Sequence, residues 1–556
     1  MDELAHLPAG YSYLTQKDMR LNPEHPPLIK DLAALPLLFV KGISFPADSS
    51  HWQKDVNGQW DFGNQFLFRS DNPAEKMIFW ARIPMILVLL LLGFYVFKWV
   101  RELAGSLAGL LALFLFSFSP TLLAHGRLVT TDIAAAFGFF VATYFFLKYL
   151  FNPGRKNLFF AGLAFGVAQL LKFSTFILVP YFGLLLFLWV LICSSGVKDF
   201  LRSFFRSAIC LGGIFVIGYV LVYGLYLFHV WNYPLEKQIS DTDFIISSHP
   251  FRWLREPLVW MAETPLLRPM AQYFLGLAMV FQRGVGGNTT YFLGEISATG
   301  WKEYFPLVYL LKEPISLHIL TLVSIFIGLW QIIKAAKNGF LQKFKEKLEH
   351  HFQELAAFLF ILLYWLMSVS GNLNIGVRHL APVIPFTILL ISSAIAPRLV
   401  QPFRKLKIAL LVFLFVFQAL SVLWVFPSFL AYFNELAGGP DKGYRYVADS
   451  NLDWGQDLKR LKIWLDKNQI KEIYLDYFGG SDTRYYLGEK YRPWQGDRNS
   501  NQLPKGSYLA VSATLLQSGR GAPTKGFNGP AGYYKWLDQY EPVAKIGHSI
   551  FIYKIE

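Results

Sequence analysis

Charged residues are scarce in this sequence. They account for 16% of its 556 residues, compared with about 25% in a typical soluble domain, whereas 54% of the residues are hydrophobic. The hydrophobic residues are also gathered into long blocks, such as MILVLLLLGFYVF at 85–97. A chain of soluble domains cannot accommodate such blocks, so we predict an α-helical polytopic membrane protein.

Cysteine is nearly absent, since Cys193 and Cys210 are the only two. Both fall at the predicted inner ends of membrane spans, and the predicted external segments contain none. The sequence therefore excludes a disulfide framework.

The apolar blocks set the number of membrane spans. A helix needs roughly 20 mostly apolar residues to cross a bilayer, and about ten segments are candidates. These are 78–98, 103–122, 130–151, 157–172, 174–195, 206–229, 313–334, 354–371, 379–398 and 408–427. The segment 157–195 is nearly continuous, and we predict that Lys172 with the following Phe-Ser-Thr forms the turn of a helical hairpin.

A net charge of +14 would suggest a nucleic-acid partner, but the basic residues are distributed by topology. They concentrate in the loops that follow the odd-numbered spans: Lys98, Arg101, Lys148, Arg155, Lys156, Lys198, Arg202, Arg206, Lys334, Lys337, Lys343, Lys345, Lys347, Arg398, Arg404, Lys405 and Lys407. The short loops on the other side contain only Arg127, Lys172 and Arg378. The positive-inside rule places the first group in the cytoplasm, so membrane lipids, and no nucleic acid, are the expected partners.

This orientation in the cell membrane places three long segments outside: a first loop 1–77, a large loop 230–312 and a soluble domain 428–556. The two blocks of spans between them are 78–229 and 313–427. Both ends of the chain are then external, and we expect the natural protein to have one more span upstream of residue 1. Residues 26–40 are apolar but short and interrupted by Pro36, which predicts a helix on the membrane surface.

The external segment 428–556 is predicted to form a small α/β domain. Residues 455–468 have helical periodicity, and 471–478, 507–513 and 549–556 have the pattern of strands. The run Asp453-Trp454-Gly455-Gln456-Asp457 is either a second site or, as we prefer, a turn and helix start with an aromatic anchor. The role of this domain is open.

Polar residues beside membrane spans are costly, so they are the first candidates for a functional site. In the predicted topology they gather at the outer face: Asp2, Glu3, Glu24, His25, His125, Arg127, Asp132, Lys172, Lys312, Arg378 and His379. Acids and cations at one depth suit a membrane-held anionic substrate.

Several motifs occur in a fixed order along the chain. They are DELAHLPAGYSYL and RLNPEHPPLIKDLAALP at the start, SPTLLAHGRLVTTDIAAA, LKFST, YFLGEISATGWKEYFPLVYLLKEP and NIGVRHLAPVIPF. Together they resemble bacterial phospholipid-carrier-dependent glycosyltransferases of the GT-C superfamily, the branch of protein O-mannosyltransferases and lipid A aminoarabinose transferases. The resemblance covers most of residues 2–400, and 432–458 is similar to a segment of those members that end in an external domain.

The resemblance implies transfer of a sugar from a polyprenyl-phosphate donor to a hydroxyl of a protein, lipid or glycan acceptor. A phosphate leaving group needs little protonation, but a carboxylate must accept the hydroxyl proton and cations must stabilise the phosphate. Asp2 and Glu3 match the acidic pair of the family, with Asp2 as general base and Glu3 as a helper or structural residue. Asp132 matches a second acidic position that orients the acceptor or shares the base role.

The resemblance also implies substrate-binding residues. Glu24 and His25 match the family's x-x-Pro-Pro motif, although His25 replaces the lysine of aminoarabinose transferases and puts a fixed charge there in doubt. Lys172 and Arg378 are our choices for phosphate binding, because arginine binds phosphate through two nitrogens. Arg127 and His379 complete the set.

Some family members bind a metal with Glu and His near the x-x-Pro-Pro position. Glu24, His229 and His379 are able to do so here, but no spacing enforces it, and no cofactor is assigned.

Each candidate also has a simpler interpretation. Asp132 could cap a helix, and Lys172 and Arg378 could be anchors at the membrane interface. The chain as a whole could be a transporter or flippase of a lipid-linked sugar or similar anion, or a non-catalytic assembly subunit. Transporters tend to have repeats and helices broken near the membrane midplane, whereas here the charges collect at one face, which favours chemistry at that face.

Overall fold

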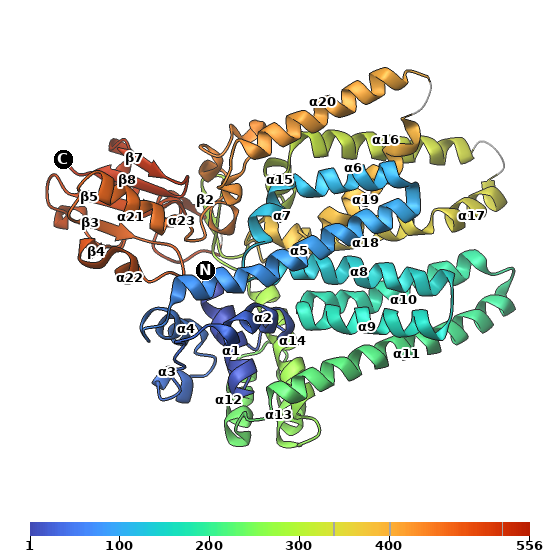
Figure 1. Cartoon of the computed structure of the whole chain (residues 1–556), viewed down its shortest axis with the longest axis horizontal. Helices are drawn as coiled ribbons and strands as arrows, with labels where there is room; N and C mark the ends of the chain where they lie inside the picture. The colour runs from blue at the N-terminus through green and yellow to red at the C-terminus, as the bar shows by residue number, and fades with distance from the viewer. Residues whose placement is uncertain (337–339, 400–401, 525) are drawn as a thin grey trace.

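The computed structural model describes residues 1–336, 340–399, 402–524 and 526–556 (Figure 1). Lys337, one of the predicted inner basic residues, lies outside this range. The chain forms a bundle of long helices with a small sheet domain at one end. We call the end that carries the sheet the domain end and the opposite end of the bundle the far end.

The predicted polytopic helical architecture is confirmed, because every predicted span is helical. These helices are α5 (Ala74–Ala104), α6 (Ser106–Ser117), α8 (Asp132–Phe151), α9 (Arg155–Leu171), α10 (Leu178–Cys193), α11 (Val197–His229), α16 (Ile315–Ala336), α18 (Phe352–Ser370), α19 (Val383–Ile395) and α20 (Arg404–Leu423). The predicted turn at Lys172 separates α9 from the 3₁₀ helix Phe173–Ile177 that leads into α10.

Six helices among the described residues are long and apolar enough to cross a membrane by themselves. They are α5, α8, α10 with its preceding turn, α11, α18 and α20. A seventh span arises if α15 (Tyr304–Lys312) and α16 count as one, although they meet at an angle of 114°. Pro314 lies at this break, where its missing N–H and its ring disfavour a continuous helix. The helices α6 and α19 are shorter apolar helices.

Small residues let two of these helices approach closely. A Cβ atom on Gly166 of α9 would lie 2.7 Å from the carbonyl oxygen of Gly218 on α11. A side chain at either position would force the helices apart, as is usual where helices pack within lipid.

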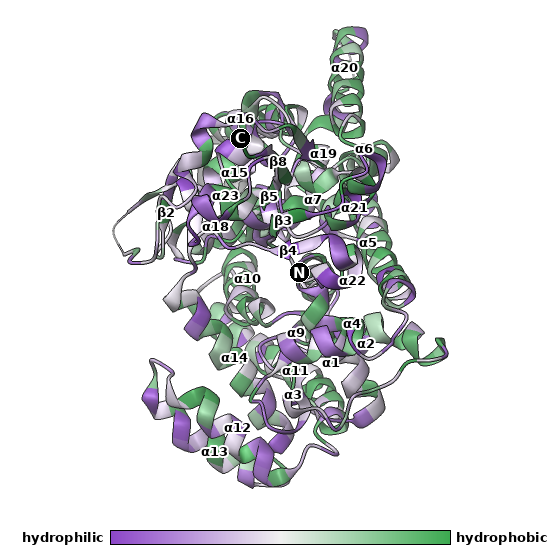
Figure 2. Cartoon of the chain, turned by 90° about the vertical axis from the view of Figure 1, so that its left-hand side faces the viewer, coloured by the Kyte–Doolittle hydropathy of each residue, from purple (hydrophilic) through white to green (hydrophobic). Residues whose placement is uncertain are grey.

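Helix α20 makes few contacts with the other helices. Only 11% of its apolar 18-residue stretch is buried. Figure 2 shows this largely hydrophobic helix projecting from the rest of the chain.

The first segment forms a group of short helices at the domain end: α1 (Glu3–Gln16), α2 (Leu28–Ala34), α3 (Ser50–Gln53) and α4 (Gln59–Phe68). The predicted surface helix is α2, followed by the 3₁₀ turn Leu35–Phe39, where Phe39 is 83% exposed. Lys30 on α2 is fully buried and donates hydrogen bonds to Tyr13 Oη and to the carbonyl oxygens of Asn22 and His25. Lys30 thereby fixes the loop that precedes Pro26.

The remaining helices connect these parts. They are α7 (Pro120–His125), α12 (Leu235–Ser247), α13 (Arg255–Glu263), α14 (Arg268–Gly286), α17 (Phe340–His350), α21 (Leu458–Lys467), α22 (Thr483–Leu487) and α23 (Ala513–Arg520). Figure 1 shows α17 at the far end of the bundle, and α12 to α14 beside the first segment.

The C-terminal segment contains the predicted sheet. Its strand order is β4-β3-β5-β8-β7, with β3 (Ile473–Asp476), β4 (Tyr491–Pro493), β5 (Tyr508–Ser512), β7 (Ala544–Ile546) and β8 (Ile550–Lys554). Strand β3 pairs in parallel with β4 and β5, and β8 runs antiparallel to β5 and β7. The predicted strands are β3, β5 and β8, and α21 is the predicted helix, whose Leu461 and Leu465 are buried against the sheet.

A second small sheet joins the C-terminal segment to the large loop. Strands β1 (Thr290–Phe292) and β2 (Glu295–Ser297) form a hairpin, and β2 pairs in parallel with β6 (Ala522–Pro523). The register places Glu295 opposite Ala522. Loop and domain are therefore tied together by backbone hydrogen bonds.

Candidate functional site

Four charged side chains from distant parts of the chain form one continuous network. Arg378 Nη1 donates to Asp2 Oδ2 at 2.9 Å and lies 3.3 Å from Asp132 Oδ2. Lys172 Nζ donates to the other oxygen of Asp132 at 2.6 Å. Asp132 is the first residue of α8, Lys172 ends α9, and Arg378 lies in a 3₁₀ turn before α19. The structure thus brings together Asp2, Asp132, Lys172 and Arg378, four of the residues predicted at the outer face.

The network contains two acids and two cations, so its charges balance. The side chain of Asp132 is only 2% exposed and lies between both cations, whereas that of Asp2 is 21% exposed. Buried charges of this kind persist only when they are paired. Asp132 is therefore fully engaged in ion pairs, and Asp2 is the carboxylate with access to solvent.

Arg378 also determines the ionisation of Asp2. Burial by itself would raise the pKa of Asp2, but the positive charges of Arg378 and its neighbours lower it below its ordinary value. Asp2 therefore remains ionised and able to accept a proton. The turn that carries Arg378 is itself held by the segment before α21, because Val377 N–H donates to Asn451 Oδ1 at 2.9 Å.

Trp454, from the C-terminal segment, completes the surroundings of Arg378. The guanidinium carbon lies 4.2 Å from the centre of the indole ring, which is a cation–π contact. The sequence indicates an aromatic anchor here but does not indicate its partner. The neighbouring Asp449 is buried, and burial raises its pKa to about 6 despite the nearby Arg378.

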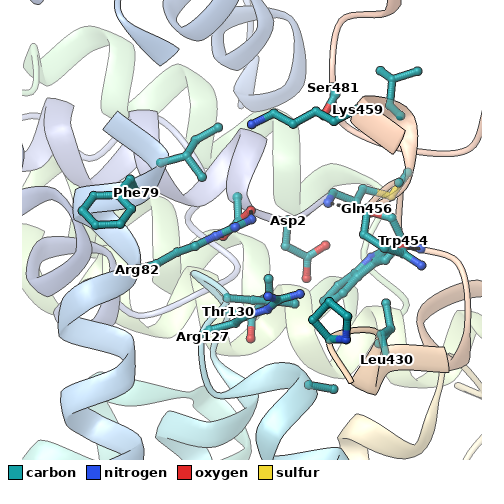
Figure 3. Close-up of a pocket in the computed structure, with 18 of the residues that line it drawn as sticks. Asp2, Phe79, Arg82, Arg127, Thr130, Leu430, Trp454, Gln456, Lys459 and Ser481 are labelled. Atoms are coloured by element: carbon teal, nitrogen blue, oxygen red, sulfur yellow. Dashed lines mark hydrogen bonds and ion pairs between the residues drawn. The ribbon is translucent and has the colours of Figure 1, made fainter. Parts of the chain in front are cut away.

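A cavity of about 580 Å³ opens beside Asp2. Figure 3 shows Asp2 between Arg82 and Arg127 on one side and Trp454 and Gln456 on the other. Helix α5 supplies an apolar wall of Phe79, Ile83 and Ile86, and the C-terminal segment supplies Lys459, Arg460 and Ser481. The cavity therefore combines a charged floor with an apolar side.

Most cations of this cavity already have acidic partners. Arg82 forms two hydrogen bonds with Glu3, at 2.8 Å and 2.6 Å. Lys459 pairs with Glu75, and Arg460 pairs with Asp457 at 2.8 Å. Arg127 lines the same cavity, and within the part of the chain that the structure describes it has no hydrogen-bond or ion-pair partner. Its positive charge is available to an anionic ligand.

Glu3 is occupied by contacts within the protein. Besides its two bonds to Arg82 on α5, it accepts a hydrogen bond from the backbone N–H of Val129 at 3.2 Å. It therefore joins α1 to α5 and to the turn before α8. This geometry favours the structural role over the catalytic one for Glu3.

The x-x-Pro-Pro residues lie next to the network without joining it. Glu24 accepts hydrogen bonds from Asn57 Nδ2 at 3.1 Å and from Gln59 Nε2 at 2.5 Å. The ring of His25 packs edge-on against that of His6 with centroids 5.0 Å apart. Burial, with His6 and Lys30 nearby, holds the pKa of His25 well below its usual range. This shift favours the neutral form of His25.

The histidines considered as metal ligands are not brought together. His229 Nε2 lies 3.0 Å from Asp31, and burial lowers the pKa of His379 to about 3. Among the described residues, the one group within ligand distance is His51, Asp55 and Asp61. It includes neither these histidines nor Glu24.

Fold and site together define a multi-pass membrane protein with a paired carboxylate network beside a partly apolar cavity. Residues 74–223 match the family model described as dolichyl-phosphate-mannose-protein mannosyltransferase. This match covers less than half of the chain and supports the resemblance to protein mannosyltransferases over those residues. No curated protein is significantly similar in sequence.

Two solved structures match this chain at low sequence identity. One is ArnT from Cupriavidus metallidurans bound to undecaprenyl phosphate, with 13% identity, a TM-score of 0.44, and coverage of 100% of this chain and 93% of that chain. The other is the archaeal oligosaccharyltransferase AglB from Archaeoglobus fulgidus in complex with an inhibitory peptide and a dolichol-phosphate, with 11% identity, a TM-score of 0.45, and coverage of 97% and 68%. Similarity at this level carries no functional conclusion.

Proposed function

We propose that this chain transfers a sugar from a polyprenyl-phosphate donor to an acceptor hydroxyl, with Asp2 as the general base. The observation that carries this proposal is the position of Asp2, ionised and bound to Arg378, at the edge of a cavity with a cationic floor and an apolar wall. The apolar wall of α5 suits the prenyl chain, and the charged floor suits its phosphate.

The proposed reaction uses the carboxylate and the cations of this site. Asp2 accepts the proton of the acceptor hydroxyl while that oxygen forms a bond to the anomeric carbon. The bond between this carbon and the phosphate oxygen breaks, and its electron pair stays on the phosphate. The products are the glycosylated acceptor, polyprenyl phosphate and a proton on Asp2, which is then released. Cations near the phosphate stabilise the charge that develops there.

Arg127 is our first choice for a direct phosphate contact, because its side chain has no hydrogen-bond or ion-pair partner among the described residues. Lys172 and Arg378 are also proposed for phosphate binding, but both contact carboxylates here. A donor phosphate would have to share them with Asp132 or Asp2. Arg82 lies at the rim of the same cavity, where it is paired with Glu3.

We place this reaction on the extracytoplasmic face. The basis is the concentration of basic residues in the loops at the far end of the bundle, which the positive-inside rule assigns to the cytoplasm. The domain end, with Asp2 and the C-terminal sheet, then faces outward.

One assay separates the candidate functions. Purified protein is reconstituted into vesicles with a radiolabelled polyprenyl-phosphate sugar, and the sugar is followed into product and across the bilayer. A glycosyltransferase forms product, a flippase moves the donor without product, and an assembly subunit does neither.

The same assay tests the role of Asp2. Asp2→Asn should reduce turnover by about 10² to 10⁴-fold, the usual contribution of a general base, while donor binding remains. Asp48→Asn is a matched control, because Asp48 lies exposed in the same segment away from the cavity. Unchanged turnover in the Asp2 variant would refute the assignment.

A further inference from the structure

A second cavity lies at the far end of the bundle, opposite the site described above. It has a volume of about 660 Å³ and lies between α16, α17, α18 and α19. Its lining residues belong to 324–331 of α16, to the last turns of α17 and α19 and to the first turns of α18, toward the far end (Figure 1). It shares no residue with the cavity beside Asp2.

Most of this cavity is apolar and open to the surroundings of the bundle. Leu329 on α16 is 55% exposed and Phe358 on α18 is 52% exposed. Leu355 and Leu390 extend the apolar wall between α18 and α19. Side chains of this kind, exposed on helices that span a membrane, contact acyl chains.

One end of the cavity is basic, with Lys347, His351 and Arg398 in its lining. Lys347 Nζ donates to the carbonyl oxygen of Gln331 at 3.0 Å, and Arg398 donates to that of Ala394. Across the described ranges neither cation has an acidic partner. Both act on His351, because their positive charges oppose its protonation. The three basic groups therefore converge on one place.

His351 has the one acidic partner in this group. Its Nδ1 lies 2.9 Å from Glu354 Oε1, and this contact raises the pKa of His351 above its usual value despite its partial burial. The other oxygen of Glu354 and the hydroxyl of Ser393 are buried, and neither has a hydrogen-bond partner in the described structure. A single carboxylate cannot balance three basic groups, so the polar end of the cavity has a positive charge.

We propose that this cavity binds the anionic headgroup of a membrane glycerophospholipid, with an acyl chain along Leu329, Leu355 and Phe358. The positive end supplies charge complementarity for the lipid phosphate, and the Ser393 hydroxyl supplies a donor. A soluble anion would leave the apolar wall unused. This site is independent of the proposed sugar transfer.

The test measures lipid binding by native mass spectrometry on the purified full chain, with phosphatidylglycerol and phosphatidylcholine of identical acyl chains. The wild type should retain one phosphatidylglycerol molecule in preference to phosphatidylcholine. The double variant Lys347→Gln/Arg398→Gln should bind phosphatidylglycerol about 30-fold more weakly, since each basic residue near an anionic lipid contributes roughly fivefold. Leu390→Trp, which fills the apolar part, should also weaken binding.

The matched control is Arg155→Gln/Lys156→Gln. It removes two exposed charges at the same end of the bundle but outside the cavity, and it should bind phosphatidylglycerol as the wild type does. Equal losses in both double variants, or equal binding of phosphatidylcholine, would overturn the proposal. Displacement of phosphatidylglycerol by polyprenyl phosphate at lower concentration would also overturn it, because the cavity would then be a carrier site.

Discussion

Arg378 donates a hydrogen bond to Asp2 at 2.9 Å although 376 positions of sequence separate them. Asp2, the proposed base, therefore gains its charged neighbours only when the first segment, the start of α8 and the turn before α19 have packed together. The contact has a second consequence, since it ties the ionisation of Asp2 to the charge at position 378.

Arg378→Gln should shift the acid limb of the pH–rate profile to higher pH. Arg378 holds the pKa of Asp2 below its ordinary value, so its removal raises that pKa, and Asp2 becomes protonated and inactive at a higher pH than in the wild type. The measurement is kcat/KM of sugar transfer across the acidic range. Arg378→Lys, which keeps the charge, is the control and should leave the limb near its original position.

The contact between Arg378 and Asp2 also makes the stability of the protein depend on pH. A carboxyl group whose pKa is lowered by folding stabilises the protein above its unfolded pKa, and that stabilisation is lost as the pH falls through the folded value. The difference in stability between wild type and Arg378→Gln should therefore shrink on acidification. A shift of the rate profile to lower pH in Arg378→Gln would contradict the proposed relationship.

Asp132→Asn should destabilise the bundle, because it leaves Lys172 and Arg378 facing a neutral amide. Breaking a buried ion pair costs about 3–5 kcal/mol, and the 15% exposure of the Lys172 side chain places this case toward the lower end. The measurement is the midpoint of thermal unfolding in detergent. The double variant Asp132→Asn/Lys172→Met removes one orphaned cation and should recover part of the loss.

Asp48→Asn serves as the control for this experiment and should unfold as the wild type does. Identical midpoints for the single and double Asp132 variants would contradict the expectation that Asp132→Asn leaves Lys172 as an uncompensated buried cation.

Arg127→Gln should raise KM for the lipid-linked donor and also lower kcat. A hydrogen bond to a charged group contributes about 1.5–3 kcal/mol, which corresponds to roughly a 10- to 100-fold change. The part of the contact that is present in the bound donor affects KM, and the part that strengthens as charge develops on the phosphate affects kcat. Arg484→Gln, an exposed arginine outside the cavity, is the matched control. An unchanged KM in Arg127→Gln would exclude a phosphate contact there.

Much of this arrangement could be predicted from the sequence, because the signals are local. Apolar blocks fix the spans, and the high cost of charge beside lipid singles out Asp132, Lys172 and Arg378 before any contact is known. The turn at Lys172 and the strands β3, β5 and β8 follow from short-range patterns. Strands β4 and β7 have only three residues each, which is too short for a period-two pattern to be recognised.

The contacts that complete the site could not be predicted, because they depend on tertiary packing. Arg82 lies near the start of the first predicted membrane span, and nothing nearby in sequence identifies Glu3 as its partner. The bend of 114° at Pro314 divides the predicted seventh span from a preceding helix that sequence assigns to a loop. Trp454 has a sequence pattern typical of a turn, and its contact with Arg378 appears only when the C-terminal segment packs on the bundle.

Trp454→Ala tests whether that contact serves the reaction. A desolvated cation–π contact contributes about 2 kcal/mol, so its loss should leave Arg378 less firmly placed and lower kcat/KM by roughly 30-fold. Because Arg378 would then act on Asp2 from a less fixed position, the acid limb should move in the same direction as in Arg378→Gln but by less. Trp454→Phe keeps an aromatic face, so its kcat/KM and its acid limb should lie between those of the wild type and those of Trp454→Ala. If Trp454 has a purely structural role, Trp454→Ala should lower the unfolding midpoint without moving the acid limb of the pH–rate profile. That result would contradict a role for the C-terminal segment in the reaction.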